Sequence, residues 1–331
     1  MRVYKDINMQ AYNTFNIAAQ AAVFIVLDQL TDIEDALTQF GNPNYILWWG
    51  SNVVISKDIH DVVWHPLFTE RKIKALGDKI YLTCGSWCIW HEIVQFTVQQ
   101  GWRGIENLIA IPWHIWAAPV QNIGAYWVEL KDAFASLEAY DFTTKEMVTL
   151  HKDDCHFGYR HSIFKEQPWR YMICNVTLEL SHNATPHLEY APLKKLADEG
   201  SMNSQQEIAT TIEQIRRSKL PKPEDFWNCW SFFQNPIVDH NITQHLLEKY
   251  PDMPHYPQVD GREKLSAARL IEQSGCKWLR EGNIWTYSRQ PLVLINYGWG
   301  TGTEALAFAQ HIIDMVYARF SISLEREVNI W

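Results

Sequence analysis

Long apolar runs and dense clusters of basic residues are missing from this 331-residue sequence. No apolar stretch approaches the roughly 18 to 20 residues that a membrane-spanning helix needs, and no secretion signal is evident, so we expect a cytoplasmic protein with no membrane partner. The formal charge is −9, from 29 basic and 38 acidic residues, and no Lys/Arg run is longer than Arg216-Arg217. Nucleic acid is not an expected partner, because too few cations gather to neutralise a phosphate backbone.

Several widespread catalytic motifs are also absent. The sequence has no Gly-x-Ser-x-Gly elbow, no Walker loop and no Gly-x-Gly-x-x-Gly fingerprint, which disfavours hydrolases, kinase-like enzymes and Rossmann dehydrogenases. Four candidate metal ligands lie close in sequence, but their spacing fits neither a Cys-x-x-Cys pair nor a His-Glu-x-x-His helix. These four are His151, Cys155, His156 and His161. We expect them to be solvated or bonded locally, and we predict no metal site.

The six cysteines do not resemble a disulfide framework. In a long chain without a secretion signal, reduced thiols are expected. Cys84 and Cys88 are separated by three residues, which is not the spacing of a redox pair. We expect both to be buried as small apolar side chains.

Glycine is scarce and tryptophan is abundant. The chain has 15 glycines among 331 residues, about 4.5% where about 7% is usual. It has 16 tryptophans, far more than ordinary usage. The positions of these tryptophans matter for the loops described below.

Hydrophobic periodicity predicts a mixture of helices and strands. The length favours two or three domains around a sizeable core. Helical spacing covers 31–37, 90–100, 201–218, 242–249, 265–273 and 303–319, and strand patterns cover 21–27, 45–47, 53–55, 79–84, 171–180 and 292–296. Thr31 carries an N-cap signature, and Pro221-Lys222-Pro223 marks a plausible domain boundary. We predict an α+β fold.

Two loops have the residue types of ligand-binding loops. Gly50-Ser51-Asn52, between two short strands, offers main-chain N–H groups, a hydroxyl and an amide. Residues 111–126 combine small residues, which allow close approach of the backbone to a flat ring, with Gln121 and Asn122, which supply donors and acceptors. The alternatives are an ordinary turn and a buried loop whose amides bond within the protein.

An ordered series of motifs resembles the flavin-dependent UDP-N-acetylenolpyruvoylglucosamine reductases along nearly the whole chain. The motifs are Asn13-Thr14-Phe15, Gly50-Ser51-Asn52, 121–126 (Gln-Asn-Ile-Gly-Ala-Tyr), Tyr159-Arg160, Lys219-Leu220-Pro221, 231–236 (Ser-Phe-Phe-Gln-Asn-Pro), Tyr256-Pro257-Gln258, 264–268 (Lys-Leu-Ser-Ala-Ala) and 324–328 (Leu-Glu-Arg-Glu-Val). The segment around Tyr190 is similar to the tyrosine-bearing loop of the longer family type.

The resemblance implies a three-domain flavoprotein of the vanillyl-alcohol-oxidase type. Its FAD-binding subdomains would cover 1–65 and 66–205, the second joined by 322–331, and its substrate-binding domain would cover 206–321. It implies reduction of UDP-N-acetylglucosamine enolpyruvate to UDP-N-acetylmuramate, with FAD and NADPH, by a monomer that makes peptidoglycan precursors for the cell wall.

The resemblance also assigns roles to residues. Arg160 and Glu327 match the residues that polarise the enolpyruvyl carboxylate, and Ser231 matches the proton donor. The implied cofactor-binding residues are Gly50, Ser51, Asn52, Ala117, Ala118, Gln121, Asn122, Ile123 and Gly124. The implied substrate-binding residues are Tyr126, Tyr159, Tyr190, Lys219 and Asn235. Singly, each of these would more often be an ordinary loop, cap or ion-pair residue.

The chain departs from the family pattern where tryptophan replaces glycine. These positions are 49, 113, 116, 127, 227 and 230, with 278, 285 and 299 as further examples. Glycine at such sites permits positive φ or close approach to a ligand, so each exchange would cost about 1 to 3 kcal/mol. The alternative functional hypothesis is therefore a variant that no longer binds FAD. A third is a protein that binds a nucleotide sugar without redox chemistry.

Overall fold

The computed structural model describes residues 1–200, 204–219, 225–258 and 260–331. These residues form two compact units. Unit 1 comprises Met1–Asp6, Ala22–Trp48 and Asp61–Ser218, and unit 2 comprises Ile7–Ala21, Trp49–His60 and Lys219–Trp331. Each unit is assembled from three separate stretches of chain. The division into three domains remains a prediction about how the chain folds.

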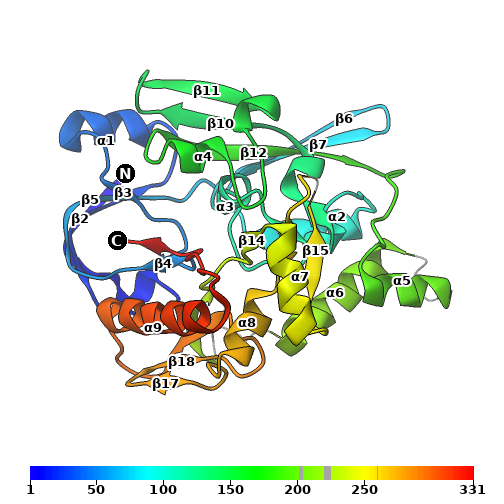
Figure 1. The fold of residues 1–331 in the computed structure, drawn as a ribbon. Coiled ribbons are helices and arrows are strands. Elements are labelled where there is room, and N and C mark those ends of the chain that lie inside the picture. The colour runs from blue at the N-terminus through cyan, green and yellow to red at the C-terminus, as the bar shows by residue number, and fades with distance from the viewer. Residues whose placement is uncertain (201–203, 220–224, 259) are drawn as a thin grey trace. The chain divides into compact units, whose positions relative to one another are not determined.

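Unit 1 contains a five-stranded antiparallel sheet in the order β11-β10-β12-β7-β6. Figure 1 shows its long strands β10, β11 and β12 side by side. The strands lying wholly or mostly in unit 1 are β1 Arg2–Asn8, β2 Gln20–Leu27, β3 Tyr45–Ile46, β5 Ile59–Pro66, β6 Arg71–Leu76, β7 Lys79–Gly85, β8 Gly124–Ala125, β9 Val128–Glu129, β10 Phe134–Asp141, β11 Glu146–His151 and β12 Tyr171–Ser181. A second sheet has the order β1-β2-β5-β3, and its β3 and β5 run parallel.

The helices of unit 1 flank these sheets. They are α1 Asp32–Phe40, α2 Trp90–Gln99, α3 Ala117–Val120, α4 Ile163–Glu166, α5 Ala191–Asp198 and α6 Gln205–Lys219, with short 3-10 turns at Glu106–Leu108, Leu130–Asp132 and Asp153–Cys155. One core cluster joins the inner faces of α2 and α6 to the five-stranded sheet. Burial of this apolar area is the main favourable contribution to the folding of unit 1.

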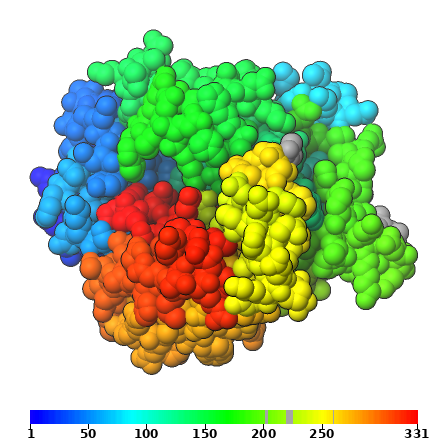
Figure 2. Space-filling model, in the orientation of Figure 1, coloured from blue at the N-terminus to red at the C-terminus, as the bar shows by residue number. Residues whose placement is uncertain are grey.

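Unit 2 contains small sheets and three helices among the described residues. Its strands are β4 Val53–Val54, β13 Trp227–Ser231, β14 Ile237–Val238, β15 His255–Pro257, β16 Glu263–Leu265, β17 Arg280–Glu281, β18 Ile284–Thr286, β19 Val293–Asn296 and β20 Asn329–Ile330; its helices are α7 His240–Lys249, α8 Ala267–Gln273 and α9 Gly302–Phe320, with a 3-10 turn at Met9–Tyr12. The sheet orders are β13-β19-β18-β17, β14-β16-β15 and β20-β4. Figure 2 shows the exposed outer surfaces of α7 (yellow) and α9 (orange to red).

The predicted elements are confirmed with shifts at their ends. Residues 201–203 of the predicted helix lie outside the described residues, and the described helix starts at Gln205. The helix predicted from 265 begins at Ala267, because Leu265 belongs to β16. The capping role of Thr31 is wrong, since its side chain makes no capping bond to α1. The Asp32 carboxylate instead accepts the N–H groups of Asp28 and Gln29 at 2.8 and 3.1 Å.

Among the described residues, no helix combines the length and apolarity that crossing a membrane requires. The chain has the mixed helix and strand content of the predicted α+β class.

Candidate functional site

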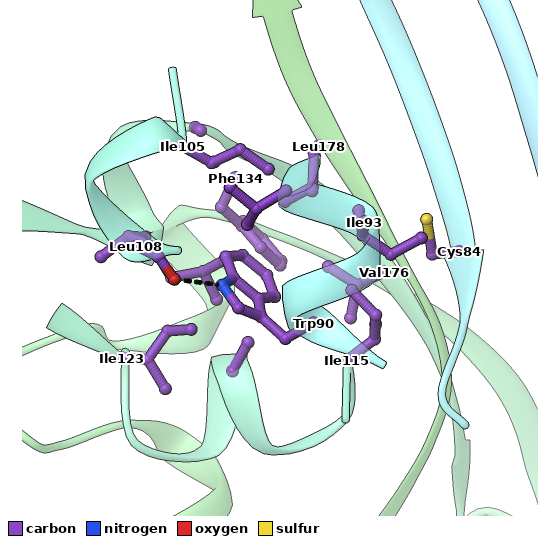
Figure 3. Close-up of a cluster of buried hydrophobic side chains, with 14 of the residues drawn as sticks. Cys84, Trp90, Ile93, Ile105, Leu108, Ile115, Ile123, Phe134, Val176 and Leu178 are labelled. Atoms are coloured by element: carbon purple, nitrogen blue, oxygen red, sulfur yellow. Dashed lines mark hydrogen bonds between the residues drawn. The ribbon is translucent and has the colours of Figure 1, made fainter. Parts of the chain in front are cut away.

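The loop 111–126 is anchored in the core of unit 1. Figure 3 shows Ile115 and Ile123 pointing toward Trp90, whose indole Nε1 donates to the carbonyl oxygen of Leu108 at 2.9 Å. Ile115 and Ile123 are buried, and so is Ala118 on α3. The loop therefore has a defined conformation, set by apolar side chains on either side of its polar residues.

The two amide side chains of this loop have different surroundings. Asn122 is fully buried, and its Nδ2 donates to the oxygen of Gly158 at 3.1 Å and to Glu129 Oε2 at 3.0 Å. Its Oδ1 accepts the N–H of Lys131 at 3.0 Å. The buried Oε1 of Gln121 has no hydrogen-bond partner among the described residues. The loop thus satisfies Asn122 internally and leaves Gln121 with an acceptor available to a ligand.

The loop Gly50-Ser51-Asn52 is built against main chain of unit 2. Gly50 has a φ of +67°, and a Cβ at this position would lie 2.1 Å from the carbonyl oxygen of Tyr12. Only glycine fits there without a rearrangement. Ser51 is buried, and Asn52 Nδ2 donates to the carbonyl oxygen of Glu327 at 3.2 Å. The loop is therefore held next to the C-terminal segment that carries Glu327.

Arginine and tyrosine side chains cluster around Gly124 in unit 1. Arg160 has a φ of +52°, and its Nη2 donates to the carbonyl oxygen of Gly124 at 3.2 Å. Its guanidinium lies 5.7 Å from the ring centre of Tyr159. The Tyr126 ring meets the Tyr190 ring edge-on at 4.7 Å, and Tyr126 also has positive φ, +53°. Burial raises the pKa of Tyr126, so this phenol is a neutral donor at physiological pH.

Ser231 and Glu327 lie near each other along the main chain of unit 2. The N–H of Glu327 donates to the carbonyl oxygen of Phe232 at 2.8 Å. Ser231 ends β13 after a register shift relative to β19, and Trp230, just before it, has a φ of +60°. Such a register shift changes the direction in which the following side chains point. Ser231 is half-buried.

The structure places the predicted site residues in two sets. Unit 1 carries Ala117, Ala118, Gln121, Asn122, Ile123, Gly124, Tyr126, Tyr159, Arg160 and Tyr190, and unit 2 carries Gly50, Ser51, Asn52, Ser231, Asn235 and Glu327. The contacts above bring members of each set together within their own unit. Asn235 Oδ1 accepts the N–H of Ala267 at 3.0 Å. Lys219 is the last residue of α6, and its side chain lies outside the described residues.

Some tryptophans at glycine-like positions do have left-handed backbone. Trp127, Trp230 and Trp278 have φ values of +68°, +60° and +64°. The predicted need for positive φ is confirmed at these positions, but not at Trp113 or Trp116, which lie outside that region. The Trp116 ring instead stacks on Trp48, with ring centres 4.9 Å apart and an interplanar angle of 16°.

Sequence reasoning missed Arg216, which was treated only as part of a short basic run. It follows Ala209 by seven residues and Ile212 by four on α6, so it shares their face of the helix. Ala209 and Ile212 are fully buried. That heptad relation was the available signal that Arg216 points into unit 1.

The remaining candidate side chains are bonded locally or buried. His156 Nδ1 and His161 Nε2 lie 3.0 and 2.8 Å from the two carboxylate oxygens of Glu166, as local bonding predicts. Among the residues described, no group of three or more ligating side chains forms a metal cluster. Cys84 and Cys88 are buried, as predicted, and all six cysteines are free.

The fold has the architecture of a known class of reductase. It matches the crystal structure of the UDP-N-acetylenolpyruvylglucosamine reductase from Thermus caldophilus with a TM-score of 0.71, over 100% of this chain and 99% of that chain, at 20% identity. At this identity the match establishes the fold. The predicted fold class is confirmed.

Sequence relatives establish the family. The model of the C-terminal domain of UDP-N-acetylenolpyruvoylglucosamine reductase matches residues 222–331. The reductase of that name from Pseudomonas putida is 38% identical over 99% of this chain and 98% of its own length. That from Pasteurella multocida is 39% identical over 97% of this chain and 95% of its own length. This chain belongs to the UDP-N-acetylenolpyruvoylglucosamine reductase family.

Proposed function

We propose that this protein reduces UDP-N-acetylglucosamine enolpyruvate to UDP-N-acetylmuramate, with FAD and NADPH, in the synthesis of peptidoglycan precursors. The observation that carries the proposal is family membership across nearly the full chain, at 38% identity to the Pseudomonas putida reductase. Full-length relatives of this name favour a working oxidoreductase over a variant that has lost FAD. We further propose that it acts as a monomer in the cytoplasm.

The residues present fit a flavin nucleotide. The buried Gln121 Oε1, which has no partner among the described residues, suits the ring N–H that a flavin presents. Gly50 keeps its loop free of a side chain that would collide with Tyr12. We propose that FAD is held by Gly50, Ser51 and Asn52 in unit 2. In unit 1 we propose Ala117, Ala118 and the 121–124 segment for the same task.

Reduction of the enolpyruvyl double bond adds a hydride to one carbon and a proton to the other. When bound, FAD would supply the hydride chemistry, with NADPH as the reductant. The Arg160 guanidinium, fixed by its hydrogen bond to Gly124, would stabilise the negative charge that grows on the substrate carboxylate. From the family match we propose that Glu327 helps to polarise the same enolpyruvyl group. The Ser231 hydroxyl would deliver the proton to the carbon beside that carboxylate.

We propose five substrate-binding residues from the match to the family's motifs. Tyr126, Tyr159 and Tyr190 present hydroxyl groups and flat apolar faces, which suit a nucleotide sugar. Lys219 and Asn235 would bind its diphosphate and sugar groups. These five assignments rest on the match to the family's motifs.

The visible spectrum and an NADPH oxidation assay test the proposal. We expect the two flavin absorption bands in desalted protein, and NADPH oxidation that requires the enolpyruvyl UDP-sugar. Arg160→Ala and Ser231→Ala should each lower kcat by about 100-fold or more while the flavin stays bound.

The matched control is Arg262→Ala, which removes an exposed guanidinium paired with Asp260 at 2.7 Å. It should leave kcat within twofold of the parent. A colourless protein that does not oxidise NADPH after addition of FAD would refute the proposed function. Unchanged kcat in both site variants would refute the role assignment.

A further inference from the structure

Arg216 extends from α6 into the protein rather than into solvent. Its helix packs Ile208, Ala209 and Ile212 into the core of unit 1. Arg216 lies on the same helical face and is half-buried, whereas Arg217 is exposed. Two adjacent arginines thus occupy very different environments.

Within the described residues, the contacts of Arg216 use only part of its donors. Its Nε donates to the carbonyl oxygen of Ala110 at 3.1 Å, and Ala110 adopts a φ of +58°. Its guanidinium also interacts with the Tyr126 hydroxyl. A guanidinium has five N–H donors, so a carbonyl and a phenol satisfy only part of it.

No carboxylate among the described residues pairs with Arg216. The nearby Glu213 binds Arg217 instead, with Nη2 and Oε1 at 2.6 Å, and also lies 3.9 Å from His91 Nε2. Burial, the largest effect, lowers the pKa of Arg216. Enclosing a cation without a counter-charge is unfavourable, so the folded protein carries a cost here that an anion would relieve.

A second guanidinium lies near the first. Arg160 is close enough to Arg216 for their mutual repulsion to lower the pKa of Arg216 further. Arg160 donates to Gly124, two residues before Tyr126. Ala110, Tyr126 and Arg160 all hold positive φ, a kind of backbone strain that gathers at ligand sites. An Arg216 guanidinium that interacts with the Tyr126 hydroxyl and lies near the Arg160 guanidinium favours a bound oxyanion.

We propose that Arg216 is an oxyanion-binding residue that acts beside Arg160 and Tyr126. The oxyanion is a carboxylate or a phosphate of the UDP-sugar, so this inference rests on the proposed function. A purely structural arginine is the competing explanation. It would stabilise the protein without ligand through its hydrogen bond to Ala110. Replacement of Arg216 should therefore lower the unfolding temperature of the unliganded protein if the role is structural, and should leave it unchanged or raise it if the role is to bind an oxyanion.

Calorimetric titration of Arg216→Gln, Arg216→Lys and Arg217→Gln tests the proposal. Arg216→Gln should weaken binding of the enolpyruvyl UDP-sugar on the order of 10- to 100-fold, because a charge-assisted hydrogen bond is lost. Arg216→Lys should keep part of the affinity, because it keeps the charge. Arg217→Gln, which removes the exposed neighbour, should stay within twofold of the parent.

The source of the oxyanion is decided by a second ligand. UDP-N-acetylglucosamine lacks the enolpyruvyl carboxylate but keeps the diphosphate. If Arg216→Gln weakens both ligands equally, Arg216 binds phosphate; if it weakens only the enolpyruvyl ligand, Arg216 binds the carboxylate. Affinities of Arg216→Gln equal to those of the parent for both ligands would overturn the proposal.

Thermal unfolding separates binding from a structural role. Without ligand, Arg216→Gln should unfold at the same temperature as the parent or higher, since it removes a half-buried charge that has no carboxylate partner among the described residues. A lower unfolding temperature together with unchanged affinities would assign a structural role and overturn the inference.

Failure of the proposed function gives a different pattern of results. A parent protein that binds both UDP-sugars but does not oxidise NADPH refutes the function and still reports on Arg216. If the parent binds neither UDP-sugar, inorganic pyrophosphate and pyruvate become the probes. They should raise the unfolding temperature of the parent more than that of Arg216→Gln, and equal shifts would overturn the inference.

Discussion

At the scale of single residues, strained backbone coincides with the residues that carry the proposed chemistry. Asn122, Tyr126 and Arg160 all have positive φ, as does Trp230 beside Ser231. Such conformations persist only where the surrounding structure enforces them. Trp278 has the same strain in unit 2, with φ +64°, but is far from any predicted site residue in sequence.

Trp278→Gly should stabilise the protein. The Trp278 residue is 65% exposed, so little packing is lost, while the left-handed backbone becomes free of strain. We expect the free energy of unfolding to rise by about 1 kcal/mol and Tm by about 2 °C in thermal unfolding. The control is Trp299→Gly, at a 76% exposed residue without positive φ, which should be neutral or destabilising. Equal shifts in both variants would contradict the strain argument.

At the scale of elements, one carboxylate joins the small sheet of unit 2 to its helix. Glu263, on the central strand β16, is buried and lies 3.2 Å from His240 Nδ1 at the start of α7. Its other oxygen lies 3.1 Å from His255 Nδ1 on β15. The hydrogen bond from His255 is the largest effect that lowers the pKa of Glu263 below its ordinary value of 4.5.

Glu263→Gln should destabilise the protein at neutral pH. Because the folded-state pKa is depressed, the stabilisation is fully present above pH 4.5 and is lost as pH falls through the folded-state value. The difference in Tm between parent and variant should therefore shrink below pH 4.5. Glu281→Gln, which removes an exposed pair with His311 in the same unit, should cost less. A Tm difference for Glu263→Gln that is constant with pH would contradict the assignment.

At the scale of the whole molecule, unit 2 depends on two short N-terminal segments. Asn296 Nδ2 donates to the carbonyl oxygen of Phe15 at 2.9 Å, and Thr14 Oγ1 donates to that of Asn228 at 2.6 Å. β20 pairs in parallel with β4, with Asn329 opposite Val53. The C-terminal stretch therefore completes its hydrogen bonds only with residues from far away in the chain.

A fragment of residues 219–331 should not fold cooperatively by itself. It lacks Phe15, which is fully buried, and the buried Asn296 side chain loses its bond to the Phe15 carbonyl and keeps only those to Gly300. Each buried polar group that loses its partner costs about 1 to 3 kcal/mol. Thermal unfolding followed by circular dichroism should show a broad transition in the fragment and a sharp one in the full chain. A sharp transition in the fragment would support an independent C-terminal domain.

Much of the architecture followed from local pattern and motif order. The strand 171–180 and the helices 90–100 and 303–319 carry clear hydrophobic periods, and all are present. Their ends shifted because end residues can take part in neighbouring elements, as Leu265 does in β16. The predicted Thr31 cap is wrong because Thr31 itself has helical dihedral angles, φ −64° and ψ −22°, whereas a capping residue typically has extended backbone.

Hydrophobic periodicity and ordered motifs are properties of the chain, so they predict the α+β class, the family and the residues that could carry chemistry. Differences between chemically similar side chains emerge only from the packing of the folded protein. In the part of the chain that the structure describes, Asn122 is satisfied while Gln121 keeps an unused acceptor, and Glu213 binds Arg217 while Arg216 has no carboxylate partner. The reason is physical: the availability of a polar group depends on what the fold packs around it, often from distant parts of the chain.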